Sequence, residues 1–180
     1  MSRREYLIMI VRGFVLAAIL SSCYSASSYS GDGHLVDNGP FAATDRYVLD
    51  LGAIALNKQG FSTYRIENLP AENFVVGIEI QVPPGQRFAI ENKSIKPTIS
   101  IELLGPQGES IIRDQSSLDT WTWSVRAMDN TAFVYRRDQP GTFFTPIKNR
   151  RYELKVGIVQ PDLGDINYSA RLLAKSGGWK

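Results

Sequence analysis

The sequence predicts an all-β chain that folds as a single antiparallel β-sandwich with a jelly-roll-like layout. Apolar and polar residues alternate over Phe74–Val82, turn residues recur at short intervals, and no window after Thr44 has helical spacing. Alternation with a period of two places every second side chain on the same face, which is a strand pattern. Short strands separated by regular turns are typical of sandwiches, and we expect about eight to ten strands.

Each predicted strand is marked by alternating apolar residues. In chain order the predicted strands are Tyr47–Leu51, Ser62–Ile66, Phe74–Val82, Ile99–Leu103, Ile111–Ile112, Trp121–Val125, Phe133–Tyr135, Tyr152–Ile158 and Tyr168–Leu172. Turn residues separate them at Lys58–Gly60, Asn68–Pro70, Pro83–Gly85, Gly105–Gly108 and Pro161–Asp165. The Gly105–Gly108 turn predicts a hairpin, and a short helix is expected near Ser116–Leu118.

Residues 1–22 have the features of a secretory signal peptide. Arg3, Arg4 and Arg12 precede the uninterrupted apolar run Gly13–Leu20, and small residues follow it. A positive segment, a short apolar segment and then small residues are the features of a cleaved signal. Because Arg12 interrupts the apolar stretch, the remainder falls short of the ~20 residues that a membrane span needs. A permanent transmembrane helix is therefore the weaker alternative.

The four residues Leu20-Ser21-Ser22-Cys23 resemble the lipobox of bacterial lipoproteins. The resemblance covers only the first 23 residues, and it implies cleavage before Cys23 and acylation of that residue, palmitate included. More than one acyl chain is needed because a single chain binds a membrane only marginally. Tyr24 stands where lipoproteins retained in the inner membrane tend to have Asp, which implies the outer membrane, facing the periplasm. Ordinary signal cleavage with an incidental Cys23 is the alternative.

The chain is thus expected to have three parts. Residues 1–22 are the signal peptide, residues 23–44 are the acylated cysteine and a flexible tether, and residues 45–180 are the sandwich. The tether is predicted because Ser and Gly dominate it and neither helical nor strand spacing occurs. It contains His34, the only histidine of the chain.

Charge and cysteine content exclude several classes of protein. The formal net charge is +2, and the three arginines and one glutamate of the signal peptide account for all of it. A neutral mature chain has no overall field to attract phosphate backbones or anionic lipid, so nucleic acid is not an expected partner. With Cys23 as its one cysteine, the chain can form no internal disulfide.

The common catalytic and metal sites are not expected either. An acylated Cys23 and a tether-borne His34 leave no Cys–His pair, no Ser-His-Asp triad and no zinc site built from these residues. The motifs G-x-S-x-G and S-x-x-K do not occur. We expect no cofactor. Loop calcium at Asp162 and Asp165, or at Asp129–Asn130, is disfavoured because these residue types also form ordinary turns.

Paired carboxylates are the remaining route to catalysis, since glycoside hydrolysis uses two acids across a cleft. The strand glutamates are Glu67, Glu79, Glu102 and Glu153. They fall on the faces opposite the apolar residues, where solvated charges are usual. A carboxylate-dependent envelope hydrolase is therefore the third hypothesis.

Aromatic and basic residues supply the candidate binding surface, which comprises Trp121, Trp123, Tyr135, Phe143, Arg136 and Arg137. Two tryptophans two positions apart on a strand share a face about 7 Å apart and could stack on sugar rings. The alternative is that both rings fill the core, as large aromatic residues usually do. Arg136–Arg137 and Lys148–Arg151 could form a basic patch for an acidic partner.

The sequence therefore favours a non-enzymatic envelope lipoprotein whose periplasmic sandwich binds another protein. A structural envelope factor and an immunity protein that neutralises a toxin both have this design. The alternative is a module that binds a glycan or peptidoglycan through its tryptophans. In each case the expected membrane contact is the acylated Cys23.

Overall fold

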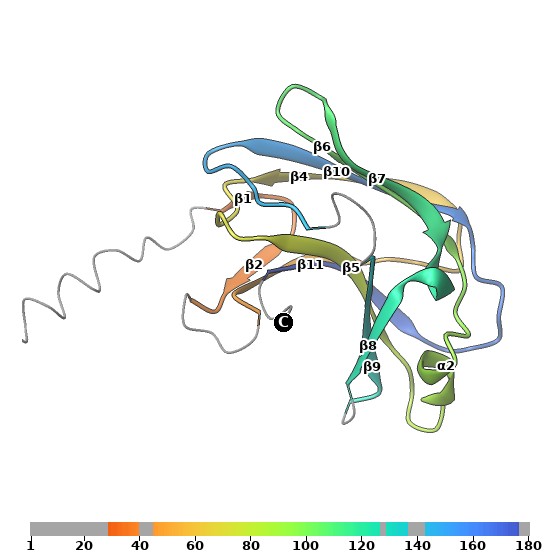
Figure 1. Cartoon of the computed structure of the whole chain (residues 1–180). Coiled ribbons are helices and arrows are strands. Elements are labelled where there is room, and N and C mark those ends of the chain that lie inside the picture. The colour runs from red at the N-terminus through yellow and green to blue at the C-terminus, as the bar shows by residue number, and fades with distance from the viewer. Residues whose placement is uncertain (1–28, 40–44, 127–128, 137–142, 177–180) are drawn as a thin grey trace, which may run out of the picture.

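A computed structural model of the chain shows two antiparallel sheets packed face to face, which confirms the predicted all-β sandwich (Figure 1). It describes residues 29–39, 45–126, 129–136 and 143–176. Sheet A has the order β1 (Ser30–Gly31), β4 (Gly60–Glu67), β10 (Arg151–Gln160), β6 (Thr98–Leu104) and β7 (Ser110–Ser117). Sheet B has the order β2 (His34–Asp37), β3 (Tyr47–Ala53), β11 (Ser169–Ser176), β5 (Phe74–Gln81), β9 (Thr131–Tyr135) and β8 (Thr122–Arg126).

The chain alternates between the sheets, so that β3, β4, β5 and β6 lie in B, A, B and A. The last two strands then enter the middle of each sheet: β10 pairs with β4 and β6, and β11 pairs with β3 and β5. β8 and β9 bend away from the rest of sheet B (Figure 1). No helix in the described ranges is both long enough and apolar enough to cross a bilayer.

The core lies between the two sheets and is built from the inward residues of each alternating strand. In β3, for example, Tyr47, Leu49 and Leu51 are buried whereas the residues between them are half-buried. β6 repeats the pattern with Ile99, Ile101 and Leu103. The alternation that predicted these strands is thus the alternation of core and outer face.

The sandwich has two ends, which we call proximal and distal. The proximal end is where Ser30, Glu67 and Arg151 stand in one row across β1, β4 and β10. The distal end carries the turn before Gly60 and the start of β11 at Ser169. Ser30, the first strand residue of the described chain, therefore lies at the proximal end.

The N-terminal segment belongs to the sandwich earlier than the sequence suggests. Residues 30–31 and 34–37, assigned to the tether, are strands β1 and β2, which pair with β4 and β3. His34 therefore lies on a strand, exposed and opposite Asp50, rather than in a free linker. Residues 1–28, including Cys23 and the signal peptide, lie outside the described residues.

Two glycines allow this segment to cross from sheet A to sheet B within a few residues. Gly31 and Gly33 have φ angles of 136° and 88°, which side-chain-bearing residues rarely adopt. A Cβ on either would also meet a backbone carbonyl oxygen, that of Arg65 or of Asp50. Between them, Asp32 binds β4 twice, since its N–H donates to the Arg65 carbonyl at 2.8 Å and its carboxylate accepts the Arg65 N–H at 2.7 Å. β1 and β2 were not predicted because strands of two and four residues are too short to show alternation.

The remaining differences concern the ends and number of elements. The described residues contain eleven strands, more than expected because of β1 and β2. The expected short helix is a 3₁₀ turn at Leu118–Thr120, so Trp121 precedes β8 instead of beginning it. A further short helix, α2 (Phe88–Glu91), was not predicted. A helix of four residues is too short for the spacing of its apolar residues to distinguish it from a loop.

The hydroxyl of Tyr29 donates a hydrogen bond to the Asp32 carbonyl at the start of this crossing. Burial, aided by the nearby negative charge of Asp32, raises the pKa of the Tyr29 hydroxyl to about 12. In the unfolded chain the same hydroxyl ionises near its ordinary pKa of 10.0, so the folded state loses stability as the pH rises from there to about 12. Tyr29→Phe should be less stable than the parent at neutral pH by about 1 kcal/mol, for the lost hydrogen bond. That deficit should shrink over the alkaline range in denaturant unfolding, and a deficit independent of pH would contradict the docking of Tyr29.

Candidate functional site

The two tryptophans of the predicted surface lie on the inner side of sheet B. Trp121 is 1% exposed and its indole N–H donates to the Ser116 hydroxyl at 2.8 Å. Trp123 is half-buried, packs against the core, and donates its N–H to the Leu118 carbonyl at 3.0 Å. Both indole N–H groups are thus used within the chain, and the structure presents no surface on which these two rings stack together.

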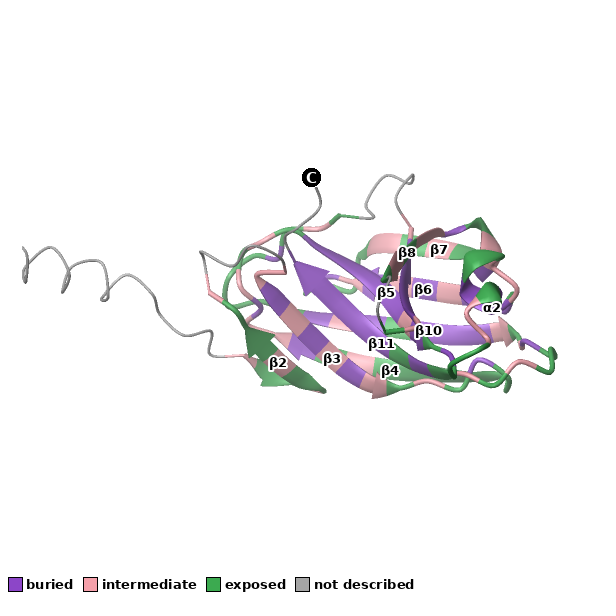
Figure 2. Ribbon diagram, turned by 90° about the horizontal axis from the view of Figure 1, so that it is seen from below, coloured by how far each residue is buried: buried purple, intermediate pink, exposed green. Residues whose placement is uncertain are grey.

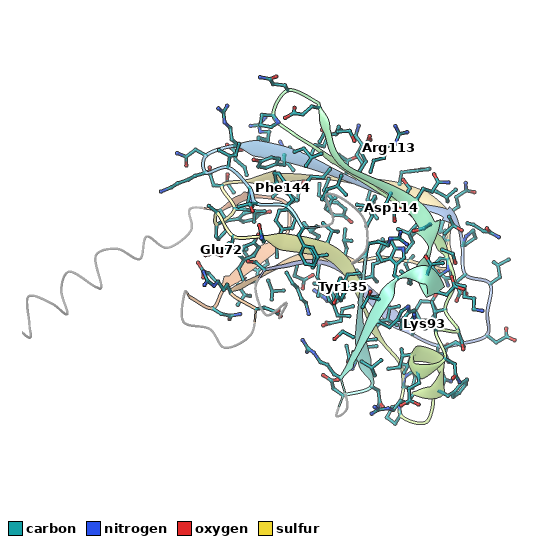
Figure 3. The ribbon with its side chains drawn as sticks, in the orientation of Figure 1. Glu72, Lys93, Arg113, Asp114, Tyr135 and Phe144 are labelled. Atoms are coloured by element: carbon teal, nitrogen blue, oxygen red, sulfur yellow. The ribbon has the colours of Figure 1, made fainter. Side chains whose placement is uncertain are left out.

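Arg136 is tied to the edge of sheet A. Its Nε lies 3.4 Å from a carboxylate oxygen of Asp114, and another nitrogen donates to the Thr120 hydroxyl at 3.2 Å. Asp114 stands opposite Ile101 in the β6–β7 ladder, so it faces inward, and Figure 3 shows it on the opposite side of β7 from Arg113. The Ser116 hydroxyl donates to the same carboxylate at 2.8 Å. This network closes the side of the core between β7 and β9, and that is a structural role.

The other predicted residues are separated from the tryptophans. Tyr135 is buried on the outer face of sheet B, where its ring stacks on Phe133 with centroids 5.5 Å apart. Phe143 is exposed, whereas its neighbour Phe144 packs edge-on against Phe74 in the core. Arg137 lies outside the described residues. The structure therefore does not bring the predicted set together as one surface.

The outer face of sheet B carries a buried apolar cluster that the sequence did not reveal. It consists of Val75, Phe133, Tyr135 and Leu173, and β5 and β11 are buried along most of their length (Figure 2). Lys175 is also buried there, at 4% exposed. Its ammonium nitrogen lies 4.4 Å from the centre of the Phe133 ring and 3.4 Å from a Glu79 carboxylate oxygen. A cation between an aromatic face and a carboxylate is a satisfied buried charge.

The nearby Asp45 belongs to the same electrostatic group. Its pKa is raised, mainly because burial disfavours the carboxylate, and the charge of Glu79 adds to the effect. Lys175 and Arg126 act in the opposite direction. Two acidic and two basic groups thus oppose one another around Lys175, of which only Lys175 is fully buried.

The outer face of sheet A is different, because it is open to solvent and carries an exposed aromatic ring. Phe61 is 75% exposed and stands directly opposite Gly157, whose Cα hydrogens its ring covers. Ser100 continues the row on β6, and Thr63 and Lys155 form the next row. We call these five residues the Phe61 surface. Because Gly157, Ser100 and Thr63 have small side chains or none, the Phe61 surface is flat around the ring, with a polar and charged edge at Lys155.

Two shallow clefts lie at the distal end, on either side of residues 167–169. One has a volume of 460 Å³ and is lined in part by Asn57 and Ile166, and the other, of 380 Å³, is lined in part by Gln81 and Pro84. Tyr168 lines both, and its hydroxyl donates to Asp162 at 3.2 Å. No acidic or basic side chain lines either cleft.

Two of the carboxylates considered for calcium, Asp162 and Asp129, have other partners. Asp162 is buried and accepts hydrogen bonds from Tyr168 and from the Lys96 N–H, so it holds two loops together. Asp129 pairs with Arg126 at 3.8 Å. Within the described ranges no three His, Cys, Asp or Glu residues are grouped as a metal site.

The four strand glutamates are likewise distributed over the two outer faces. Glu67 pairs with Arg151 at 3.4 Å, and Glu153 pairs with Lys155 at 3.3 Å. Glu102 stands opposite Lys155 on sheet A, while Glu79 contacts Lys175 on sheet B. None of the four lines either distal cleft.

Comparison with known proteins adds no functional assignment. The sequence matches no protein-family model, and no curated protein is significantly similar to it.

Substitution of Gly77 tests how tightly the outer face of sheet B is packed. A Cβ at this position would lie 2.6 Å from both the Phe133 ring and the Val134 carbonyl oxygen. Gly77→Ala should therefore destabilise the fold by about 2–3 kcal/mol in denaturant unfolding, since the clash involves backbone as well as the ring. Gly60→Ala is the matched control, because nothing lies within 4 Å of its Cβ position. Equal stabilities of the two variants would show that the Phe133 ring does not pack on Gly77.

Proposed function

We propose that this chain is a lipid-anchored envelope lipoprotein, held at the outer membrane by an acylated Cys23, whose sandwich binds another protein in the periplasm. The observation that carries the binding function is the Phe61 surface. The address rests on the signal peptide and the Leu20–Cys23 motif, and the binding function rests on the geometry of sheet A.

The Phe61 surface has the composition expected of a small protein interface. Phe61 is 75% exposed, so a partner that covers it removes a large aromatic side chain from water, which favours binding. Aromatic residues commonly supply most of the binding energy at the centre of an interface, with polar residues at the rim. Phe61 lies flat against Gly157 and is therefore already ordered, which lowers the entropy lost on binding. These features favour a protein partner.

The glycan alternative is supported by a different observation, the two distal clefts. Their walls carry the amides of Asn57, Asn167 and Gln81 and no charged side chain. Neutral amides with an aromatic residue nearby suit a polar, uncharged ligand such as a sugar. The clefts, rather than the two tryptophans, are thus where a glycan would bind, and they rank second because they are shallow.

The address is tested by metabolic labelling with palmitate. The parent chain should incorporate label and fractionate with membranes, whereas Cys23→Ser should incorporate none, because Cys23 is the only cysteine. A parent protein without label would contradict the proposed anchor.

The binding function is tested by placing a photo-crosslinking residue at position 61 in the full-length protein. The expected result is one discrete crosslinked protein species. Phe61→Ala should then weaken binding of that partner at least tenfold, as is usual for a central aromatic residue. The same change should lower the stability of the domain by only about 0.2–1 kcal/mol, the scale of one cross-strand pair.

Leu163 provides the matched control, since it is 85% exposed on a loop of the distal end. Leu163→Ala should leave the crosslink and the affinity unchanged. Binding to isolated peptidoglycan that survives Phe61→Ala but is lost in Asn167→Ala would instead favour the glycan alternative.

A further inference from the structure

A basic loop lies beside the point at which the chain leaves the sandwich toward Cys23. The loop is Ile147–Arg150 and it leads directly into β10. Arg151, the first residue of β10, shares a row with Glu67 and Ser30 on two successive neighbouring strands. Strands in a sheet are about 4.8 Å apart, so the backbones of Arg151 and Ser30 are separated by roughly 10 Å.

Hydrogen bonds fix the conformation of this loop. The N–H of Ile147 donates to the Tyr152 hydroxyl at 2.9 Å, and the Arg150 carbonyl accepts the N–H of Asn68 at 3.4 Å. Asn149 has a φ of 61°, the left-handed conformation that Asn tolerates in tight turns. The loop therefore presents Ile147, which is 62% exposed, in a defined position just before the cations Lys148 and Arg150.

Neither cation of the loop has an acidic partner in the described part of the chain. Lys148 and Arg150 are exposed and form no ion pair with any described residue, whereas Arg151 pairs with Glu67. The next acidic residue along the proximal end, Glu72, pairs with Arg46. The loop is thus locally positive although the mature chain as a whole is neutral.

The length of the chain limits how far this loop can be from the anchor. Cys23 and Ser30 are seven residue steps apart, and even a fully extended chain of that length spans at most about 25 Å. The proximal end, with the basic loop, is therefore the part of the sandwich nearest to any membrane that holds Cys23.

We infer that residues 147–151 form a contact surface for anionic phospholipid headgroups. Lys148 and Arg150 bind lipid phosphates, and Ile147 inserts its side chain among the headgroups. An exposed apolar side chain next to cations is typical of interfacial membrane contacts. This inference rests on the proposed membrane anchor. It implies that the sandwich stands with its proximal end on the bilayer instead of moving freely on a tether.

The test uses the full chain reconstituted into vesicles of phosphatidylcholine alone or of equal parts phosphatidylcholine and phosphatidylglycerol. An environment-sensitive fluorophore is attached at Ile147→Cys or, at the distal end, at Leu163→Cys. The expected result is a blue shift at position 147 on phosphatidylglycerol vesicles only, reversed by high salt because the charges are screened. Position 163 should show no shift on either vesicle.

Charge variants provide the matched control. Each cation that reaches an anionic surface strengthens the contact about fivefold, so Lys148→Gln with Arg150→Gln should weaken it about 25-fold and abolish the shift at position 147. Lys58→Gln with Lys96→Gln removes the same charge from exposed distal positions and should leave the shift unchanged. A solvent-like emission at position 147 on anionic vesicles, or an equal response at position 163, would overturn the inference.

The same measurements in a Cys23→Ser background separate this inference from the proposed anchor. In that variant the uncleaved signal peptide, not an acyl group, keeps residue 23 at the bilayer, and the mass of the parent protein reports acylation independently. A shift at position 147 together with a parent protein whose mass shows no acyl group would uphold the loop contact and reject the anchor. An acylated parent protein without a shift at position 147 would uphold the anchor and reject the loop contact. Crosslinking of the loop to an acidic protein in place of lipid would also reject the loop contact.

Discussion

Both sheets depend on hydrogen bonding by the last two strands of the chain. β10 is the only link between β4 and β6, and β11 is the only link between β3 and β5 among the described strands. Without β10, sheet A would fall into two unconnected pieces, and the same holds for sheet B without β11. Neither sheet can therefore be completed until the C-terminal part of the chain is in place. Such non-local pairing is slow to form and makes the fold cooperative.

The inner faces of the sheets can meet only once those strands are present. Since the chain has a single cysteine, no disulfide can assist, and burial of the inward apolar residues must hold the sheets together. The central strands contribute residues such as Leu154, Val156 and Leu172 to this core. Hydrogen bonding within each sheet and apolar packing between them are thus coupled through β10 and β11.

The two sheets divide the remaining roles between them. The central strands of sheet B, β11, β5 and β9, are largely buried on both faces, and their outer face holds Lys175 between Phe133 and Glu79. Sheet A is buried on one face only, so its outer face is available for a ligand or a partner. The two glycine–aromatic pairs show the same division, because Phe133 over Gly77 is buried whereas Phe61 over Gly157 is exposed.

Sequence patterns predicted the fold where one residue in two faces solvent. β3, β6 and the β6–β7 hairpin follow from alternation and turn residues alone. β5 was predicted as a strand from its alternation, but the alternation did not reveal that Val75, on the outer face, is buried as well. Alternation shows which residues share a face of a strand. It does not show whether apolar residues on the outer face are buried by other parts of the fold.

The candidate site was predicted less well, for reasons that lie in the same residues. Trp121 and Trp123 are two positions apart, yet Trp121 precedes the strand and both N–H groups bond to the Ser116–Leu118 segment. Phe61 was not singled out because one aromatic residue among polar ones gives no pattern. Its significance comes from Gly157, almost a hundred residues later in the chain, and only the register of β4 against β10 joins them.

The N-terminal crossing relates the two proposed surfaces to each other. Through Gly31 and Gly33 it fixes Ser30 at the proximal end, beside Glu67 and the basic loop. Phe61 lies six residues further along β4 toward the distal end, which is about 20 Å at the rise of an antiparallel strand. With the proximal end on the bilayer, the Phe61 surface faces sideways at that height above the headgroups. On that proposal, a partner that binds there must extend at least that far from the bilayer, so a segment confined to the membrane could not reach it.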